Sequence, residues 1–240
     1  MTESPPPDKP TSALPHCIVI IPAHNEAEDI GFVIGEINKY TNFPVVVIDD
    51  ASTDNTILLA KQAGAVVVPL AVQLGAWGAT QAGLRYALKN RFAYAITMDA
   101  DGQHLAESLP ALLRPIMNKE ADVTIGACTK RGSRARKIAW TLIKQASGLK
   151  LEDLTSGFRV YDRRAIRRLA KWQATLFEYQ DVGVLAMLQA SDLVIKDVEV
   201  RMLPRRHGKS RIFYSWTSVF YYMSYTLLLS ITKRGMKHDL

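Results

Sequence analysis

The sequence lacks features that mark several common classes of protein. Only two cysteines, Cys17 and Cys128, occur in 240 residues, which excludes a disulfide scaffold and indicates a reducing compartment. Cys17 opens a predicted strand, where we expect a small buried residue. Residues 1–15 are rich in proline, serine and threonine without an apolar run, so we expect a disordered leader and no signal peptide. With no internal repeat, the chain should form one large domain or a domain with an appendage.

Glycine is absent from the loop where a dinucleotide cofactor would need it. The segment after the first predicted strand, residues 22–26, contains no glycine that would let the backbone approach a pyrophosphate. A P-loop motif is absent as well. If the protein binds a diphosphate, other groups must therefore neutralise its charge, such as a metal ion with nearby arginine and lysine side chains.

Basic residues outnumber acidic ones, 30 to 23, which gives a formal net charge of +7. This excess predicts an anionic partner: nucleic acid, a phosphate-bearing substrate or a lipid surface. Nucleic-acid binding is not expected, because no aromatic residues alternate with the basic ones and no recognition-helix pattern is present. A membrane surface accounts better for the surplus charge.

Short apolar runs alternate with amphipathic segments along most of the chain. Asn25 and Glu28 have the spacing of an N-cap and its reciprocal acid, and the apolar residues from Ile30 to Ile37 form one helix face. Strands are predicted at 18–21, 45–48, 66–68, 94–98, 123–125 and 192–200, and helices at 30–37, 56–63, 79–89, 109–118 and 163–171. The alternation predicts an α/β fold, with a mainly parallel, Rossmann-like sheet and helices on both faces.

Polar side chains follow three of these strands. Because ligands bind at the carboxyl ends of the strands in such sheets, we expect the three loops to meet at one edge and form a binding site. Residues 52–54 are also typical of a turn and helix cap. The side chains concerned are Asn25 and Glu26 after the first strand, Asp49 and Asp50 after the second, and Asp99 and Asp101 after the fourth.

Asp99 and Asp101 occupy alternate positions of what we expect to be an extended backbone. This spacing predicts that both carboxylates point the same way. Two carboxylates that converge at a strand end repel each other unless a cation lies between them. Mg²⁺ is often held by one or two carboxylates and substrate phosphates, so the pair is a candidate metal site. Such pairs are also common as solvated loop residues.

Five motifs in a fixed order resemble the family-2 inverting glycosyltransferases. They lie at residues 22–26, 47–54, 99–104, 155–159 and 206–210. Within that family the chain looks most similar to the dolichyl- or polyprenyl-phosphate mannosyltransferase branch. The resemblance implies a GT-A fold over residues 16–211, a nucleotide-diphosphate sugar donor, Mg²⁺ or Mn²⁺, and a polyprenyl or dolichyl phosphate as acceptor.

The resemblance also implies residues that bind the donor. Those that would hold the nucleoside are Pro22, Glu26, Ile48 and Asp50, with His24 in the position of a usual tyrosine, where it is expected to alter base stacking. Those that would surround the metal and the diphosphate are Asp99, Asp101 and Gln103, with Ala100 touching the donor through its backbone. Cys128 falls near a usual arginine, so Lys130 or Arg131 is expected to supply that charge.

The same resemblance implies which residues act on the phosphates and the acceptor. Arg206 and Lys209 would lie on a mobile loop that contacts the donor and acceptor phosphates. Asp101 would share the catalytic role with these two residues. Asp153 and Asp181 are the two acids that could orient the acceptor. Asp181 falls where the family carries an acid, but it is equally typical of an N-cap for the apolar segment that follows. An alcohol acceptor would need a general base, whereas a phosphate with a second pKa of about 6 arrives ionised.

Residues 212–232 contain no charged side chain. Their length suits a membrane span, but many serines, threonines and tyrosines make them only moderately apolar, and basic residues flank both ends. We expect residues 212–240 to form interfacial helices that lie on the bilayer and present the lipid acceptor. The alternatives are a single short membrane span, packing on the core, or packing on a partner subunit of an oligomer. The expected location is the cytoplasmic face of a membrane.

The function expected from these residues is a metal-dependent, inverting transfer of a hexose from a nucleotide-diphosphate sugar to a polyprenyl or dolichyl phosphate. Mannose from GDP-mannose is the first choice, and glucose from UDP-glucose is the second. Two alternatives remain open. One is a glycosyltransferase that uses a glycan hydroxyl as acceptor, and the other is a catalytically silent membrane scaffold that binds nucleotide sugars.

Overall fold

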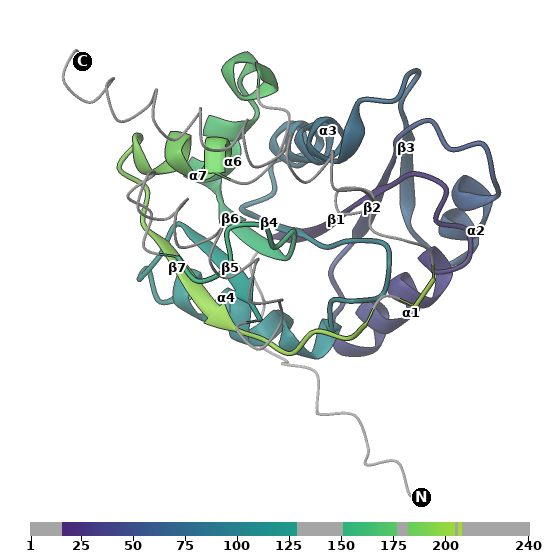
Figure 1. Cartoon of the computed structure of the whole chain (residues 1–240), viewed down its shortest axis with the longest axis horizontal. Coiled ribbons are helices and arrows are strands. Elements are labelled where there is room, and N and C mark those ends of the chain that lie inside the picture. Colours follow the sequence, from purple (N-terminus) through teal and green to yellow (C-terminus); the bar gives the residue numbers. More distant parts are fainter. Residues whose placement is uncertain (1–15, 129–150, 177–181, 205, 208–240) are drawn as a thin grey trace, which may run out of the picture.

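The computed structural model describes residues 16–128, 151–176, 182–204 and 206–207. The predicted leader, residues 1–15, and the predicted C-terminal helical segment, residues 212–240, lie outside these ranges. Among the described helices, none is both long enough and apolar enough to cross a bilayer. The described residues are built around one seven-stranded sheet (Figure 1).

The strands of the sheet follow the order β3-β2-β1-β4-β6-β5-β7. They are β1 (Cys17–Ala23), β2 (Val45–Asp49), β3 (Val66–Pro69), β4 (Tyr94–Thr97), β5 (Val123–Ala127), β6 (Arg159–Asp162) and β7 (Ile195–Glu199). Every strand predicted from an apolar run is present. β1 lies between β2 and β4 and is parallel to both, so the three strands that precede the polar loops are neighbours.

β6 is the strand that the sequence did not predict. It is antiparallel to both of its neighbours, β4 and β5, whereas the other pairs are parallel. β6 begins with a fully buried arginine, Arg159. Its guanidinium donates to the carbonyls of Ser156 (Nε, 2.8 Å) and Leu154 (Nη2, 2.8 Å). A short strand that opens on a buried charge has little apolar pattern to recognise, so the prediction of a mainly parallel sheet was correct but incomplete.

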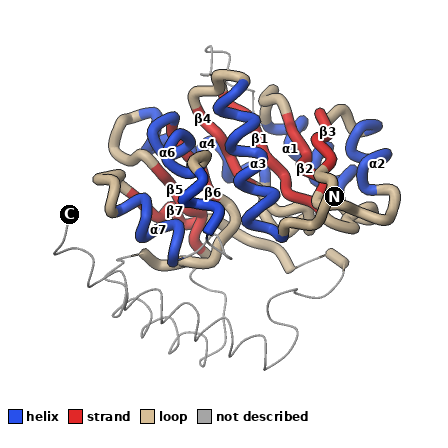
Figure 2. The backbone as a smooth tube through the Cα atoms, turned by 90° about the horizontal axis from the view of Figure 1, so that it is seen from above, coloured by secondary structure: helices blue, strands red, loops and turns tan. Residues whose placement is uncertain are grey.

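Helices cover both faces of the sheet, as predicted (Figure 2). On one face lie α3 (Gly75–Lys89), α6 (Arg163–Leu169) and α7 (Val182–Gln189), and on the other lie α1 (Ile30–Tyr40), α2 (Thr56–Gln62) and α4 (Leu109–Met117). Two short 3₁₀ helices, η1 (Ala106–Ser108) and η2 (Trp172–Leu176), are also present. The apolar face predicted for α1 is buried, which confirms its orientation.

The start of α1 differs from the prediction. The helix begins at Ile30, with Asp29 in the N-cap position and no side-chain cap hydrogen bond. Asn25 instead has a left-handed backbone with φ 54°. Its side-chain oxygen accepts hydrogen bonds from the backbone N–H (2.8 Å) and the hydroxyl (3.3 Å) of Thr53. The predicted capping box was therefore wrong, because a partner in the next loop satisfies the Asn25 side chain.

Cys17 is buried at the start of β1, as expected. Burial raises the pKa of its thiol to about 12. The thiol therefore stays protonated and unreactive at neutral pH.

Gly83 of α3 lies directly against the central strands of the sheet. A Cβ added at this position would overlap the Cγ2 methyl of Ile20 and lie 3.2 Å from Cγ1 of Ile48, and both of these side chains are fully buried. We expect Gly83→Ala to lower the free energy of unfolding by about 1–3 kcal/mol, the usual consequence of overpacking a core. Urea denaturation measures this change.

Gly35 in α1 offers a matched control, because a Cβ at this position would meet no atom within 4 Å. Gly35→Ala should raise the free energy of unfolding by about 0.5–1 kcal/mol, since alanine loses less backbone freedom than glycine in a helix. If the Gly83→Ala and Gly35→Ala proteins proved equally stable, the contact between α3 and β1 would be looser than the structure indicates.

Candidate active site

Three strand ends bring the predicted polar loops to one edge of the sheet. β1 and β2 pair in parallel, so that Pro22 lies beside Ile48 and Ala23 lies beside Asp49. β4 is parallel to β1 on its other side, and its carboxyl end leads into the segment that carries Asp99. The loops after β1, β2 and β4 therefore meet at one edge, as the sequence predicted.

The loops after β1 and β2 are joined by hydrogen bonds into one unit, which we call the loop platform (residues 22–27 and 49–56). The backbone N–H of Asp50 donates to the carbonyl of Ala23 at 2.7 Å. The N–H groups of Asn25, Glu26 and Ala27 donate, respectively, to the hydroxyl of Ser52 (2.9 Å), the hydroxyl of Thr56 (2.9 Å) and the carboxylate of Asp54 (3.2 Å). The platform thus fixes the relative positions of two loops from separate strands.

Asp54 anchors this platform. Its carboxylate accepts hydrogen bonds from the backbone N–H (2.9 Å) and the hydroxyl (2.5 Å) of Thr56, as well as from Ala27. Partial burial opposes ionisation of the carboxyl group, but these hydrogen bonds outweigh that effect and lower the pKa of Asp54. The platform therefore keeps its charged anchor at neutral pH.

His24 is half-buried in the platform, with Nδ1 2.6 Å from the carbonyl oxygen of Asp50. A carbonyl only accepts, so Nδ1 carries a proton and donates it. Nε2 lies 3.4 Å from the side-chain nitrogen of Asn25. These contacts orient the imidazole, and Pro22 and Glu26 of the same loop are also half-buried.

Asp50 and Ile48 link the platform to α3. The carboxylate of Asp50 accepts the backbone N–H groups of Leu74 (Oδ1, 2.6 Å) and Gly75 (Oδ2, 2.9 Å), the residues at which α3 begins. This charge at the helix N-terminus explains why α3 begins earlier than residue 79. Ile48 is fully buried against α3, so its side chain belongs to the core and only its backbone approaches the edge of the sheet.

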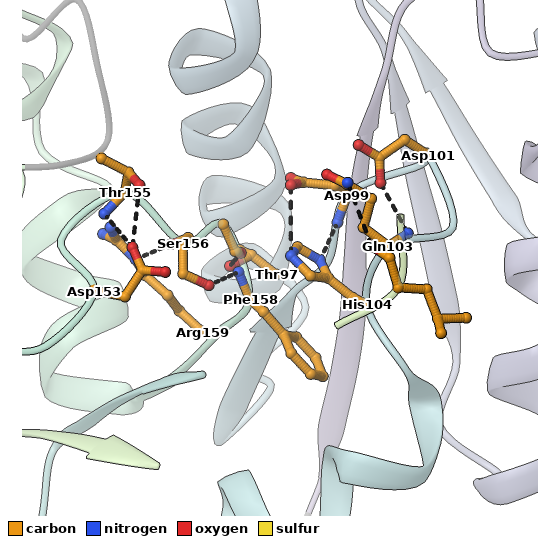
Figure 3. A network of polar contacts seen from close by, with 12 residues as sticks. Thr97, Asp99, Asp101, Gln103, His104, Asp153, Thr155, Ser156, Phe158 and Arg159 are labelled. Carbon is orange, nitrogen blue, oxygen red and sulfur yellow. Dashed lines mark hydrogen bonds and ion pairs between the residues drawn. The ribbon is translucent and has the colours of Figure 1, made fainter. Parts of the chain in front are cut away.

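Asp99 and Asp101 lie in a turn rather than on extended backbone. β4 ends at Thr97, and residues 99–102 form what we call the acidic turn, in which Gly102 has φ 72° (Figure 3). Oδ1 of Asp101 accepts the backbone N–H of Gln103 at 3.0 Å, which closes the turn. The prediction of extended backbone at these two residues was therefore wrong, because the chain turns here.

The acidic turn fits a divalent cation whose coordination is completed by a ligand. The described residues contain no group of three His, Cys, Asp or Glu side chains that could hold a metal ion. The side chain of Asp99 is 40% exposed, whereas Asp101 is buried. Gln103 is buried and donates its side-chain nitrogen to the carbonyl of Leu203 at 3.5 Å, so its oxygen is the atom suited to a metal. Two carboxylates suit Mg²⁺ or Mn²⁺ that also binds phosphate oxygens.

The segment after β7 folds back over the acidic turn. His104 and Met202 form an isolated antiparallel bridge, and the backbone N–H of Leu203 donates to the carbonyl of Gln103 at 2.9 Å. Further along, the N–H of Arg206 lies 3.4 Å from the carbonyl of Asp101. Arg206, which was predicted from a motif about one hundred residues away, therefore lies beside the acidic turn.

Arg206 is held in place by a residue that the sequence analysis missed. Its Nε lies 3.2 Å from Oδ1 of Asp29, and its guanidinium lies over the ring of Phe32, 3.7 Å from the ring centre. Asp29 is only 2% exposed, and the same oxygen lies 2.9 Å from Nδ1 of His207. In the sequence, Asp29 resembles an ordinary helix-capping acid, so no local signal indicates its ion pairs.

The motif at residues 155–159 is tied to β4, the strand that leads into the acidic turn. The hydroxyl of Thr97 donates to the carbonyl of Gly157 at 2.7 Å, which ties the motif to β4. Asp153 is buried, and its Oδ1 accepts the backbone N–H (3.0 Å) and the hydroxyl (3.1 Å) of Thr155 (Figure 3). This arrangement is typical of a turn.

Several predicted site residues lie outside the part of the chain that the structure describes. These are Arg131, Asp181 and Lys209. Ala100, by contrast, is buried in the acidic turn, and Cys128 is half-exposed directly after β5.

The sequence profile named Glycosyl transferase family 2 matches residues 18–172, which is more than half of the chain. The chain belongs to glycosyl transferase family 2. It is therefore a glycosyltransferase, as the order of its motifs predicted. The matched residues include the loop platform, the acidic turn and the motif at 155–159.

Two relatives show which enzymes this family 2 glycosyltransferase is similar to. The undecaprenyl-phosphate mannosyltransferase of Micrococcus luteus is 32% identical over 168 residues, which cover 63% of this chain and 68% of that protein. The polyprenol monophosphomannose synthase of Mycolicibacterium smegmatis is 29% identical over 169 residues, which cover 63% of each chain. The chain thus spans less than two thirds of the second relative.

A solved structure supports the fold of this family 2 glycosyltransferase. Glucosyl-3-phosphoglycerate synthase from Mycobacterium tuberculosis, in complex with Mn²⁺, uridine diphosphate and phosphoglyceric acid, has a TM-score of 0.67. The match covers 91% of this chain and 78% of that one, at 18% sequence identity. The likeness confirms the GT-A fold expected from the sequence.

Proposed function

We propose that this family 2 glycosyltransferase transfers a hexose from a nucleoside-diphosphate sugar to the phosphate of a polyprenyl- or dolichyl-type lipid. The observation that carries the proposal is the position of Asp99 and Asp101 at the same sheet edge as the loop platform. In this proposal, that edge would hold the nucleoside next to the diphosphate. The names of the relatives described above support this class of acceptor and mannose as the sugar. GDP-mannose stays the first choice of donor, and UDP-glucose the second.

The loop platform is the proposed nucleoside site. Pro22, His24 and Glu26 lie half-buried along it, and the imidazole is already oriented by the carbonyl of Asp50. The carboxylate of Asp50 is engaged at the start of α3, but each of its oxygens retains a lone pair for the edge of a base. Ile48 would contribute through its backbone alone.

The acidic turn is the proposed diphosphate site. Asp99, Asp101 and Gln103 would hold Mg²⁺ or Mn²⁺, and the backbone of Ala100 would contact the donor. When bound, such an ion stabilises the negative charge on the departing nucleoside diphosphate. Arg206, held by Asp29 beside the turn, would supply further positive charge from the chain itself.

The proposed reaction is a single displacement with inversion. An oxygen of the acceptor phosphate forms a bond to the anomeric carbon while the bond from that carbon to the diphosphate oxygen breaks. The acceptor is largely ionised at neutral pH, because the second pKa of a phosphate monoester is about 6, so no general base is required. Lys209 and Arg131 would add charge near the phosphates, and Asp181 would orient the acceptor, since Oδ1 of Asp153 is engaged by Thr155.

We further propose that the enzyme works at the cytoplasmic face of a membrane, through residues 212–240. The net charge of +7 supports attraction to anionic lipid headgroups. Association of these residues with a second subunit stays a prediction.

A binding panel followed by a transfer assay tests the proposed function. The thermal unfolding of the full chain is measured with GDP, UDP, GDP-mannose and UDP-glucose, each with and without Mn²⁺. We expect stabilisation by the nucleotides of one base only, and only with Mn²⁺, amounting to about 2.7 kcal/mol at a ligand concentration one hundred times Kd. The sugar nucleotide that stabilises the protein is then supplied in labelled form with a polyprenyl phosphate.

The matched control for the transfer assay is the corresponding polyprenyl alcohol. We expect labelled lipid from the phosphate and none from the alcohol. Transfer to the alcohol or to a glycan hydroxyl instead would favour the hydroxyl-acceptor alternative. Nucleotide binding with no transfer to any acceptor would contradict the proposal.

A further inference from the structure

A buried histidine lies directly beneath the acidic turn and has no part in the function proposed above. His104 is mostly buried, yet both of its ring nitrogens face Asp99. Nδ1 is 3.1 Å from the backbone nitrogen of Asp99, and Nε2 is 3.6 Å from its carboxylate oxygen Oδ2 (Figure 3). One side chain thus contacts both the backbone and the carboxylate of the exposed acid in the proposed metal site.

The backbone contact determines the tautomer of His104. The N–H of Asp99 can only donate, so Nδ1 must offer its lone pair and carry no proton. In the neutral ring the proton is then on Nε2, the nitrogen that lies near the Asp99 carboxylate. The distance of 3.6 Å is too long for a direct hydrogen bond, but the Nε2–H donor is on the side of the ring nearest the carboxylate acceptor.

The imidazole is anchored from two directions. Its ring stacks on Phe158, with ring centres 4.9 Å apart and an interplanar angle of 12°, and Phe158 is fully buried. The backbone of His104 is bridged to Met202, in the segment that leads to Arg206. The ring therefore cannot move without disturbing the core, which makes it a rigid support for an otherwise exposed carboxylate.

We propose that His104 is a positioning residue that orients Asp99 for the cation and the diphosphate. The inference rests on the proposed function, because it assigns a role at the same site. A carboxylate that is 40% exposed loses rotamer freedom when it binds a cation, and a fixed backbone with a facing Nε2–H reduces that loss. Groups that orient a metal ligand in this way typically change metal affinity by about 10–100-fold when they are removed.

Substitutions at His104 separate the ring from its nitrogens. His104→Phe keeps a ring that can stack on Phe158 but leaves the Asp99 N–H without an acceptor. His104→Asn loses the ring but places an oxygen close to the position of Nδ1, so it can still accept that N–H. We expect His104→Phe to raise the half-saturating Mn²⁺ concentration about tenfold and His104→Asn to restore most of the affinity.

The measurement is direct titration of Mn²⁺ by electron paramagnetic resonance, with GDP or UDP present and no sugar transfer required. Nucleotide affinity at saturating Mn²⁺ should change by less than the Mn²⁺ affinity. A general loss of structure would instead weaken both affinities. Thermal unfolding verifies the fold of each variant. If His104→Phe does not fold, His104→Gln takes its place, because its longer side chain carries the amide to the Nε2 position and leaves Nδ1 unreplaced.

The outcomes distinguish this inference from the function on which it rests. Wild-type Mn²⁺ affinity in His104→Phe or His104→Gln would overturn the positioning role. Equal loss in His104→Asn and His104→Phe would overturn the assignment to Nδ1. If the unmodified protein binds no Mn²⁺ with either nucleotide, both the proposed metal site and this inference are overturned.

Discussion

Asp101→Asn should lower the rate of sugar transfer by about 10³-fold, a loss typical when one preorganised charge-stabilising group is removed. The change removes a negative charge from the pair proposed to hold Mg²⁺ or Mn²⁺. It keeps the size of the side chain and an oxygen that can still accept the backbone N–H of Gln103, now 3.0 Å from Oδ1. Since the acidic turn should keep its shape, the loss would report on charge alone. Initial rates at saturating donor, lipid phosphate and Mn²⁺ measure it.

Glu107 provides the matched control for this variant. It is an exposed acid in η1, a few residues beyond the acidic turn. Glu107→Gln removes the same charge from the same region of the chain, and we expect the transfer rate to stay at the wild-type value. Full activity in Asp101→Asn would mean that the buried carboxylate is not part of the catalytic site.

Arg206→Ala should lower the transfer rate by about 10²-fold, because the guanidinium no longer stabilises the charge on the phosphates. The position of Arg206 supports this expectation. Its backbone N–H lies 3.4 Å from the carbonyl of Asp101. Its side chain also approaches Gly102 so closely that a Cβ added to that glycine would lie only 2.7 Å from Cδ of Arg206. Only Nε is engaged by Asp29, at 3.2 Å, so the two terminal nitrogens remain suited to phosphate oxygens.

Asp29→Asn should lower the transfer rate by about tenfold, which is part of the loss expected for Arg206→Ala. The substitution releases Arg206 from its fixed orientation without removing the guanidinium. In the Arg206→Ala background, Asp29→Asn should cause little further loss in rate. A double-mutant cycle on the transfer rate tests this dependence, because only coupled residues give non-additive effects. Glu28, whose side chain is 75% exposed and lies 3.9 Å from His207, is the control acid.

Glu28→Gln should leave the rate unchanged, because an exposed pair at that distance contributes little. Additive losses from Asp29→Asn and Arg206→Ala would show that Asp29 does not act through Arg206. Thermal unfolding of Asp29→Asn is needed as well, because Asp29 is buried at the start of α1.

Much of the fold was predictable because its signals are local. Strands β1 to β5 are largely apolar runs of four to seven residues, and α1 carries its buried residues with helical spacing. The position of the polar loops followed from the rule that parallel strands end at one edge. β6 escaped prediction because its place between β4 and β5, and its buried Arg159, depend on partners elsewhere in the chain.

The candidate site was predictable in its residue types but not in its geometry. Asp99 and Asp101 were expected on extended backbone, yet they lie in a turn closed by the N–H of Gln103. Asn25 was expected to cap α1, yet its side chain bonds to Thr53 in the next loop. For Asn25, a tertiary contact replaced the expected local cap. For the acidic pair, a local hydrogen bond from the N–H of Gln103 to the Asp101 side chain favoured a turn over extended backbone.

The sequence by itself determined the family, the alternation of strands and helices, and the carboxylates at the strand ends, because apolar spacing and motif order are properties of short segments. Only the tertiary structure decided that Asn25 binds a residue 28 positions away and that Asp29 binds Arg206, 177 positions away. It also decided that His104 lies under Asp99 and against Phe158. Such contacts depend on how the strands are ordered in the sheet, and no short stretch of the chain carries that information.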